Sequence, residues 1–125
     1  MSLADLQATR AFPVDAEPPE RLWFHSAPFP AGRRVRSVLD EQDCQYLALE
    51  EWASRDPTMF EGAHVLDIGA ADGFYALAAA MGGAASVTAI DCDYRDWPLN
   101  LRDLSAAWGM EPVVHTGDFR VFDFA

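Results

Sequence analysis

Residues 65 to 73 read Val65-Leu66-Asp67-Ile68-Gly69-Ala70-Ala71-Asp72-Gly73, and the apolar helix formers of residues 74–80 follow directly. A short apolar run, a glycine-containing turn and a helix start are typical of a buried parallel strand that leads into a helix. Such a turn presents backbone N–H groups at a helix N-terminus, where nucleotide-like ligands can bind. A second carboxylate, Asp91, ends another apolar run one strand–helix unit later. The two carboxylates together predict a binding site.

Strands and helices alternate on both sides of this turn. The expected strands span residues 64–68, 86–91 and 112–116, and the expected helices span residues 73–81 and 98–108. This alternation predicts an α/β fold with a Rossmann-like parallel sheet. Successive right-handed crossovers give the strand order 3-2-1 and place both connecting helices on one face of the sheet.

The second face of this sheet has no obvious cover. The strands are apolar on both sides, as in sheets that are buried on both faces. The strand at residues 64–68 would also leave a bare edge. We therefore expect either a partial domain that belongs to a longer fold, or self-association or a partner at the exposed sheet face.

The N-terminal region differs in composition. Residues 3–12 could form a short helix, and residues 13–32 hold five of the eight prolines, which predicts an extended arm without regular structure. Trp23-Phe24-His25 is unusually apolar for such an arm; an anchor to the core is favoured over a flap above a ligand. Residues 40–56 are expected to form a helix.

Composition narrows the function classes. The 125 residues suffice for one domain, and the formal net charge of −11 argues against nucleic-acid binding by this chain alone. Arg33, Arg34 and Arg36 are better explained as a solvated loop than as a phosphate site. The two cysteines and three histidines are too dispersed to predict a metal site. Without a signal peptide or a membrane span, the expected location is the cytoplasm.

The glycine spacing constrains the ligand. The turn has the pattern G-x-x-x-G, whereas the dinucleotide fingerprint is G-x-G-x-x-G. Ala71 would crowd a pyrophosphate, and Asp67 and Asp72 add negative charge where a phosphate would be repelled. The predicted ligand is therefore uncharged or cationic at this position.

Three segments together resemble the class I S-adenosylmethionine-dependent methyltransferases. Residues 65–73 look like the first motif of that family, with alanines in place of its usual central glycine. Val87-Thr88-Ala89-Ile90-Asp91 looks like the second motif, and Gly117-Asp118-Phe119 looks like the third. The resemblance implies a cofactor, S-adenosylmethionine, that is positively charged and carries no phosphate.

The resemblance also implies roles for individual residues. Asp67 and the backbone of Gly69 would hold the methionine portion, Asp91 the ribose hydroxyls, and Asp118 and Phe119 the adenine. The full set expected to bind the cofactor is Asp67, Gly69, Ala70, Ala71, Gly73, Phe74, Asp91, Cys92, Asp118 and Phe119. No catalytic base can be assigned.

The resemblance covers the N-terminal part of the family's fold. Residues 1–39 are expected to be the N-terminal helix and arm, and residues 40–125 a partial cofactor-binding domain. Trp23-Phe24-His25-Ser26 and Asp72-Gly73-Phe74 also resemble, more weakly, the methyltransferases related to wobble-uridine tRNA modification enzymes. The expected function is methyl transfer to a small molecule or an RNA. A non-catalytic binding or interaction module is the alternative, and an NAD-dependent oxidoreductase is less favoured.

Overall fold

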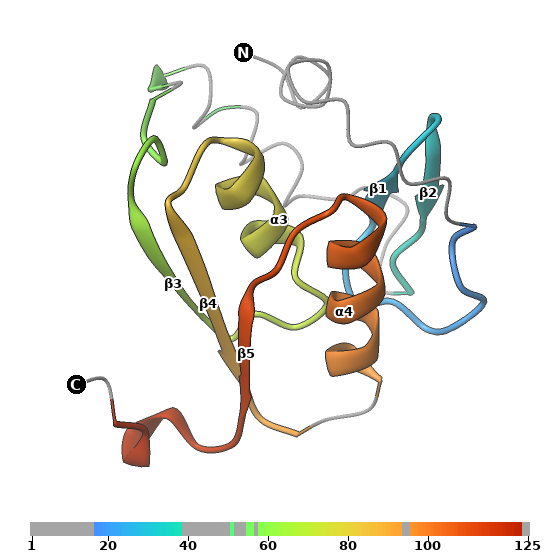
Figure 1. Cartoon of the computed structure of the whole chain (residues 1–125). Coiled ribbons are helices and arrows are strands. Elements are labelled where there is room, and N and C mark those ends of the chain that lie inside the picture. The colour runs from blue at the N-terminus through green and yellow to red at the C-terminus, as the bar shows by residue number, and fades with distance from the viewer. Residues whose placement is uncertain (1–16, 39–50, 52–54, 57, 94–95, 124–125) are drawn as a thin grey trace.

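Three parallel strands form the central sheet, in the order β3-β4-β5 (Figure 1). They are β3 (His64–Ile68), β4 (Ser86–Asp91) and β5 (Val113–Thr116). The computed structural model describes residues 17–38, 51, 55–56, 58–93 and 96–123. The predicted parallel sheet and its strand order are confirmed, whereas the helix expected at residues 3–12 and most of that at 40–56 lie outside the described residues.

Two helices cover one face of the sheet. They are α3 (Phe74–Met81) and α4 (Trp97–Ala107), within one residue of the predicted starts and ends. Ala76 and Ala79 of α3 pack against Val87 of β4, while Trp97 and Leu101 of α4 pack against Ala70 and Ala89. Both connecting helices therefore lie on the same face, as the crossover rule predicts.

The arm contains a β-hairpin, so the prediction that it lacks regular structure is wrong. Strand β1 (Ala27–Phe29) pairs antiparallel with β2 (Arg33–Val35). Proline is tolerated in β1 because a two-stranded hairpin has only edge strands, whose outward N–H positions need no partner. Arg33 and Arg34 therefore belong to a strand rather than to a solvated loop, and Arg33 forms an ion pair with Glu17 at 2.7 Å.

The hairpin forms a third layer on the helices (Figure 1). Trp23 and Phe29 are almost fully buried, with their rings edge to face at 5.8 Å. The indole Nε1 of Trp108 donates a hydrogen bond to Pro28 O at 2.8 Å. Side chains of the arm and of both helices thus share one hydrophobic cluster. The predicted anchor role of Trp23 is confirmed.

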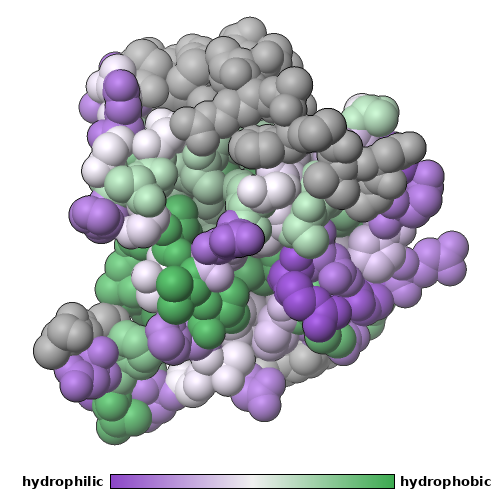
Figure 2. Space-filling view, viewed as in Figure 1, coloured by the Kyte–Doolittle hydropathy of each residue, from purple (hydrophilic) through white to green (hydrophobic). Residues whose placement is uncertain are grey.

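The other face of the sheet is partly open in the described part of the chain: β3 is exposed there, whereas Ile90 of the central strand is buried. Leu66 and Ile68 pair in register with Thr88 and Ile90, on the face opposite Val87 and Ala89. Leu66 is 43% exposed and Ile68 is 50% exposed. Figure 2 shows hydrophobic surface gathered over the strands. The expected uncovered face is present, and β3 forms an edge of the sheet.

Among the described residues, no helix combines the length and the apolar character needed to cross a membrane.

Candidate cofactor site

The turn after β3 has an unusual backbone. Gly69, Ala71 and Gly73 all have positive φ angles, of 79°, 44° and 89°. Gly69 N donates to Ile90 O at 2.8 Å and Gly73 N donates to Ala70 O at 2.9 Å, so the turn is fixed to β4 and closed on itself. A left-handed alanine costs about 1–2 kcal/mol. The turn therefore stores strain at the place where the sequence predicts a ligand.

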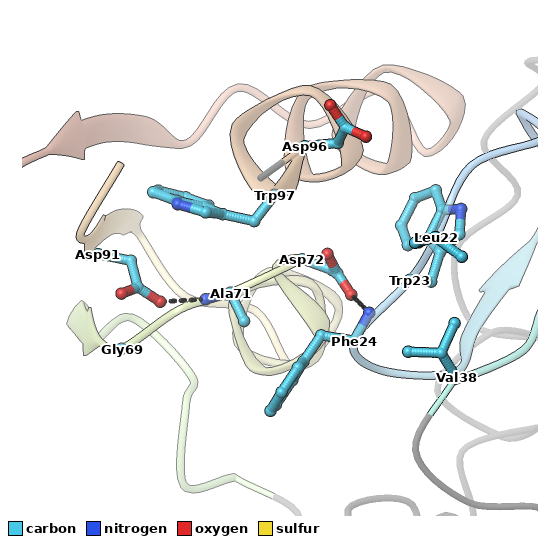
Figure 3. A pocket seen from close by; sticks show the side chains of 10 residues that line it. All are labelled: Leu22, Trp23, Phe24, Val38, Gly69, Ala71, Asp72, Asp91, Asp96 and Trp97. Atoms are coloured by element: carbon cyan, nitrogen blue, oxygen red, sulfur yellow. Dashed lines mark hydrogen bonds between the residues drawn. The ribbon is translucent and has the colours of Figure 1, made fainter. Parts of the chain in front are cut away.

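Asp91 lies at the end of β4, facing this turn (Figure 3). Its Oδ2 accepts a hydrogen bond from Ala71 N at 2.9 Å, and its Oδ1 accepts one from Cys92 N at 2.7 Å. A carboxylate oxygen can accept two hydrogen bonds. The Cys92 thiol also hydrogen-bonds to this carboxylate. Asp91 therefore keeps acceptor capacity for one further donor, such as a ligand hydroxyl group.

The surroundings of Asp67 disfavour the charged form of its carboxylate. Its Oδ2 is buried and has no hydrogen-bond partner among the described residues. Burial raises the pKa of Asp67, a backbone hydrogen bond from Ala76 opposes that rise, and the charge of Asp91 adds to it. A cation bound beside Asp67 and Asp91 would stabilise both carboxylates in their charged forms.

Asp118 and Phe119 lie beyond β5, where the chain turns into a short helix, η1 (Phe119–Val121). Arg120 holds the pKa of the Asp118 carboxyl below its usual range through a side-chain ion pair at 2.6 Å and a backbone hydrogen bond. The Phe119 side chain is 48% exposed. An aromatic ring and a carboxylate thus lie beside Cys92. Their role in holding an adenine, which the third motif implies, stays a prediction.

Two hollows meet at Gly69 and Asp91, which line both of them. The wider hollow, of about 680 Å³, is lined by the strand ends and by Cys92, Asp118 and Phe119. We call it the strand-end hollow. The second, of about 320 Å³, lies between the turn, the start of α4 and the arm (Figure 3). We call it the arm hollow. Both volumes are of the size typical of small-molecule sites, roughly 300–1,000 Å³.

The predicted site residues divide into two groups. Six of them line one or both hollows: Gly69, Ala71, Asp91, Cys92, Asp118 and Phe119. The other four line neither hollow: Asp67 is half-buried, and Ala70, Gly73 and Phe74 are buried. Contact between a cofactor and any of the ten residues stays a prediction.

Asp72 has a structural role that the sequence did not indicate. Its Oδ2 accepts hydrogen bonds from the backbone N–H groups of Phe24 and His25, the latter at 2.8 Å. Its Oδ1 accepts one from Asn100 Nδ2 at 3.0 Å. This carboxylate is almost fully buried. It connects the arm to residues 69–73, the turn between β3 and α3, which we call the cofactor turn.

The sequence also missed part of the arm hollow. Leu22, Val38, Asp96 and Trp97 line it, together with Trp23 and Phe24. The Trp97 indole N–H donates to Cys92 O, which fixes the indole against the loop that follows β4. In the sequence, only the apolar segment Trp23-Phe24-His25 indicated that the arm lines a hollow. The spacing of residues along the chain does not predict contacts between segments about 70 residues apart.

Comparison with solved structures identifies the fold. A "putative RNA methyltransferase" from Pyrococcus horikoshii superposes with a TM-score of 0.53 and 26% identity over 61% of this chain. A "putative sam-dependent methyltransferase" from Streptococcus mutans gives a TM-score of 0.47 and 25% identity over 59% of the chain. The matched parts span 38% and 19% of those two proteins. No family model and no curated protein sequence matches the chain.

The chain therefore has, over part of its length, the fold of the class I S-adenosylmethionine-dependent methyltransferases. That finding agrees with the resemblance of the three sequence motifs.

Proposed function

We propose that this chain binds S-adenosylmethionine at the carboxyl ends of β3, β4 and β5, as the cofactor-binding part of a methyltransferase that acts on a small molecule or an RNA. The proposal depends mainly on two carboxylates, Asp67 near the end of β3 and Asp91 at the end of the neighbouring strand β4. Asp67 has a buried carboxylate oxygen without a partner among the described residues, and Asp91 has acceptor capacity left beside its backbone and Cys92 hydrogen bonds. A ligand with a cationic amino acid end and a ribose would satisfy both.

The residues fit the parts of the cofactor in order. Asp67 and the Gly69 backbone would face its ammonium group, Asp91 its ribose hydroxyls, and Cys92, Asp118 and Phe119 its adenine. Asp118 would contact the adenine amino group with whatever acceptor capacity the Arg120 ion pair leaves. When bound, the cofactor supplies an electrophilic methyl group on a sulfonium ion.

Transfer of that methyl group requires alignment and exclusion of water more than acid–base chemistry. A bound cofactor would supply this methyl group to a lone pair on the acceptor, with S-adenosylhomocysteine as the other product. A protonated nitrogen or oxygen acceptor would release its proton to water. Gly69 and Asp91 line both hollows. They would hold the cofactor so that its methyl group faces the acceptor.

A non-catalytic module that keeps the cofactor site is the second candidate. The open apolar sheet face favours it, because such a face suits contact with another protein surface. An NAD-dependent reaction is disfavoured by the crowded, acidic turn, where a pyrophosphate would meet Ala71 and two carboxylates.

Isothermal titration with S-adenosylhomocysteine, S-adenosylmethionine and NAD tests the proposal. We expect both adenosyl compounds to bind, NAD not to bind, and Asp91→Ala to weaken binding at least about tenfold, the equivalent of one lost ribose hydrogen-bond pair. Glu61→Gln is the matched control, since this exposed carboxylate lies before the opposite end of β3. Tighter binding of NAD than of the adenosyl compounds would overturn the proposal.

A further inference from the structure

The arm hollow has an apolar wall that the fold itself does not require. Leu22, Phe24 and Val38 are 61%, 45% and 52% exposed, yet all three line the hollow. In Figure 3, Leu22 and Val38 lie across the hollow from Trp97 and Asp91. Exposed large apolar side chains that converge on one concavity mark a ligand site more often than a packing need.

The charged side chains that line the hollow are all acidic. Asp72 is engaged with the arm backbone and Asn100, and Asp91 accepts two backbone hydrogen bonds. Asp96 is exposed at the start of α4, and its side chain caps no backbone N–H group there. No arginine lines the hollow in the described part of the chain, and the sequence contains no lysine.

These charges select among ligands. A phosphate or carboxylate in the hollow would lie beside three carboxylates with no cationic partner, which raises the free energy of its charged form. RNA binding needs several phosphate contacts from basic side chains. An apolar ring gains free energy from contact with Phe24 and Trp97, and a positive charge gains from Asp96.

We propose that the arm hollow binds the methyl acceptor, and that this acceptor is a small, planar, largely apolar molecule that is neutral or cationic. The inference rests on the proposed function, because the hollow is an acceptor site only if the cofactor occupies the adjoining strand-end hollow. Gly69 and Asp91 line both hollows, so a molecule in one borders a molecule in the other.

Matched indole probes test the selectivity of the hollow. Tryptamine is cationic, indole is neutral and indole-3-acetate is anionic, while their ring system is the same. Each is titrated calorimetrically into the full chain, alone and saturated with S-adenosylhomocysteine, and a short single-stranded RNA is titrated in parallel. We expect tryptamine and indole to bind, indole-3-acetate to bind at least about tenfold more weakly than tryptamine, and the RNA not to bind.

Variants assign the binding to the arm. Phe24→Ser and Leu22→Ser should weaken tryptamine and indole alike while S-adenosylhomocysteine binding is unchanged. Asp96→Asn should reduce the preference for tryptamine over indole. Leu99→Ser is the control, because this exposed apolar residue of α4 lines neither hollow.

The outcomes separate the two proposals. If S-adenosylhomocysteine binds but the anionic probe or the RNA binds as tightly as tryptamine, the acceptor class is wrong and the proposed function stands. The acceptor inference also fails if Phe24→Ser and Leu99→Ser have the same effect on tryptamine. If S-adenosylhomocysteine does not bind at all, the proposed function fails, and the acceptor role of the hollow fails with it.

Discussion

Gly69 and Gly73 border the cofactor turn with similar backbone angles but different surroundings. Their φ angles are 79° and 89°. A Cβ at residue 69 would meet nothing within 4 Å, whereas a Cβ at residue 73 would lie 2.7 Å from Leu101 Cγ and 3.0 Å from its Cδ1. Gly69 therefore leaves the turn open to a ligand, while Gly73 lets α3 and α4 approach each other.

Gly73→Ala should destabilise the protein strongly. A left-handed alanine costs about 1–2 kcal/mol, and overpacking against the buried Leu101 adds about 1–3 kcal/mol. Gly62→Ala is the control, because Gly62 has a φ of 69° and an added Cβ there meets nothing within 4 Å. Denaturant unfolding measures both variants. Equal losses of unfolding free energy would contradict the packing role of Gly73.

The raised pKa of Asp67 predicts that the free energy of unfolding depends on pH. The group favours the folded state at pH values below its unfolded pKa, and this contribution is lost as pH rises through the higher folded pKa. Asp67→Asn should therefore unfold at a higher temperature than the unmodified protein at pH 7, with a smaller difference near pH 4.

The same Asp67→Asn variant should bind S-adenosylmethionine about tenfold more weakly, since one charged partner of the ammonium group is gone. Calorimetric titration and thermal unfolding of the same sample measure both effects. A variant that is less stable at pH 7 but binds normally would show that Asp67 is structural.

Cys92 is exposed, yet the neighbouring Asp91 carboxylate raises the pKa of its thiol, by a hydrogen bond and by its charge. Because the thiolate is the reactive form, Cys92 should be alkylated by iodoacetamide at pH 8 more slowly than an ordinary exposed cysteine. Asp91→Asn should accelerate the reaction severalfold. Peptide mass mapping follows Cys92 separately from Cys44, and an unchanged rate in the variant would contradict the electrostatic cause.

Among the elements, the arm and α4 are joined by a polar network. Asn100 Nδ2 donates to Asp72 Oδ1 at 3.0 Å and to Leu22 O at 2.9 Å, and its Oδ1 accepts from Arg21 Nε at 2.9 Å. Arg21 also forms an ion pair with Asp103. The amide of Asn100 thus links the arm, the cofactor turn and α4 in one buried position.

Asn100→Ala should weaken this link and loosen the arm. Hydrogen bonds to charged groups contribute about 1.5–3 kcal/mol each, and here one acceptor is a buried carboxylate. We expect unfolding free energy to fall by about 2–3 kcal/mol, and trypsin to cleave after Arg21 faster. Arg102→Ala, an exposed change on the same helix, is the control. Equal protection of Arg21 in both variants would contradict the proposed link.

An element could be predicted from the sequence where residues close together in the chain specify it. The strands and both helices could be predicted because apolar spacing, Gly73 and Pro98 specify them within a few residues. The β1–β2 hairpin could not, since it is held by contacts such as that of Trp108 with Pro28. Likewise the acids at the strand ends were predictable as a site, whereas the arm wall and the role of Asp72 depend on segments distant in sequence.

At the scale of the whole molecule, one face of the sheet is packed and the other is open in the described region. Leu66, Ile68 and Val113 are each more than two-fifths exposed. The proposal that this face meets a second copy or another protein follows from the apolar area that it leaves in water.

Ile68→Thr should therefore cost little stability but reduce binding of the neutral dye Nile red and any concentration-dependent association seen in sedimentation. We expect a loss below about 1 kcal/mol, because half of the Ile68 side chain is already solvated. Ile90→Thr is the contrasting variant, since Ile90 is 1% exposed and should lose more stability. Unaltered dye binding in Ile68→Thr would show that the open face is not the dye site.

The layering of the hairpin over α4 has a consequence for synthesis. Trp108, which bonds to Pro28, follows it in the chain by 80 residues. Translation adds about 5–20 residues per second, so the side chains of Trp23 and Phe29 would be exposed to solvent for several seconds before their partners leave the ribosome. Nascent chains of this protein should therefore depend on chaperones that shield aromatic segments, and the arm should acquire protection from proteases only after Trp108 has left the ribosome.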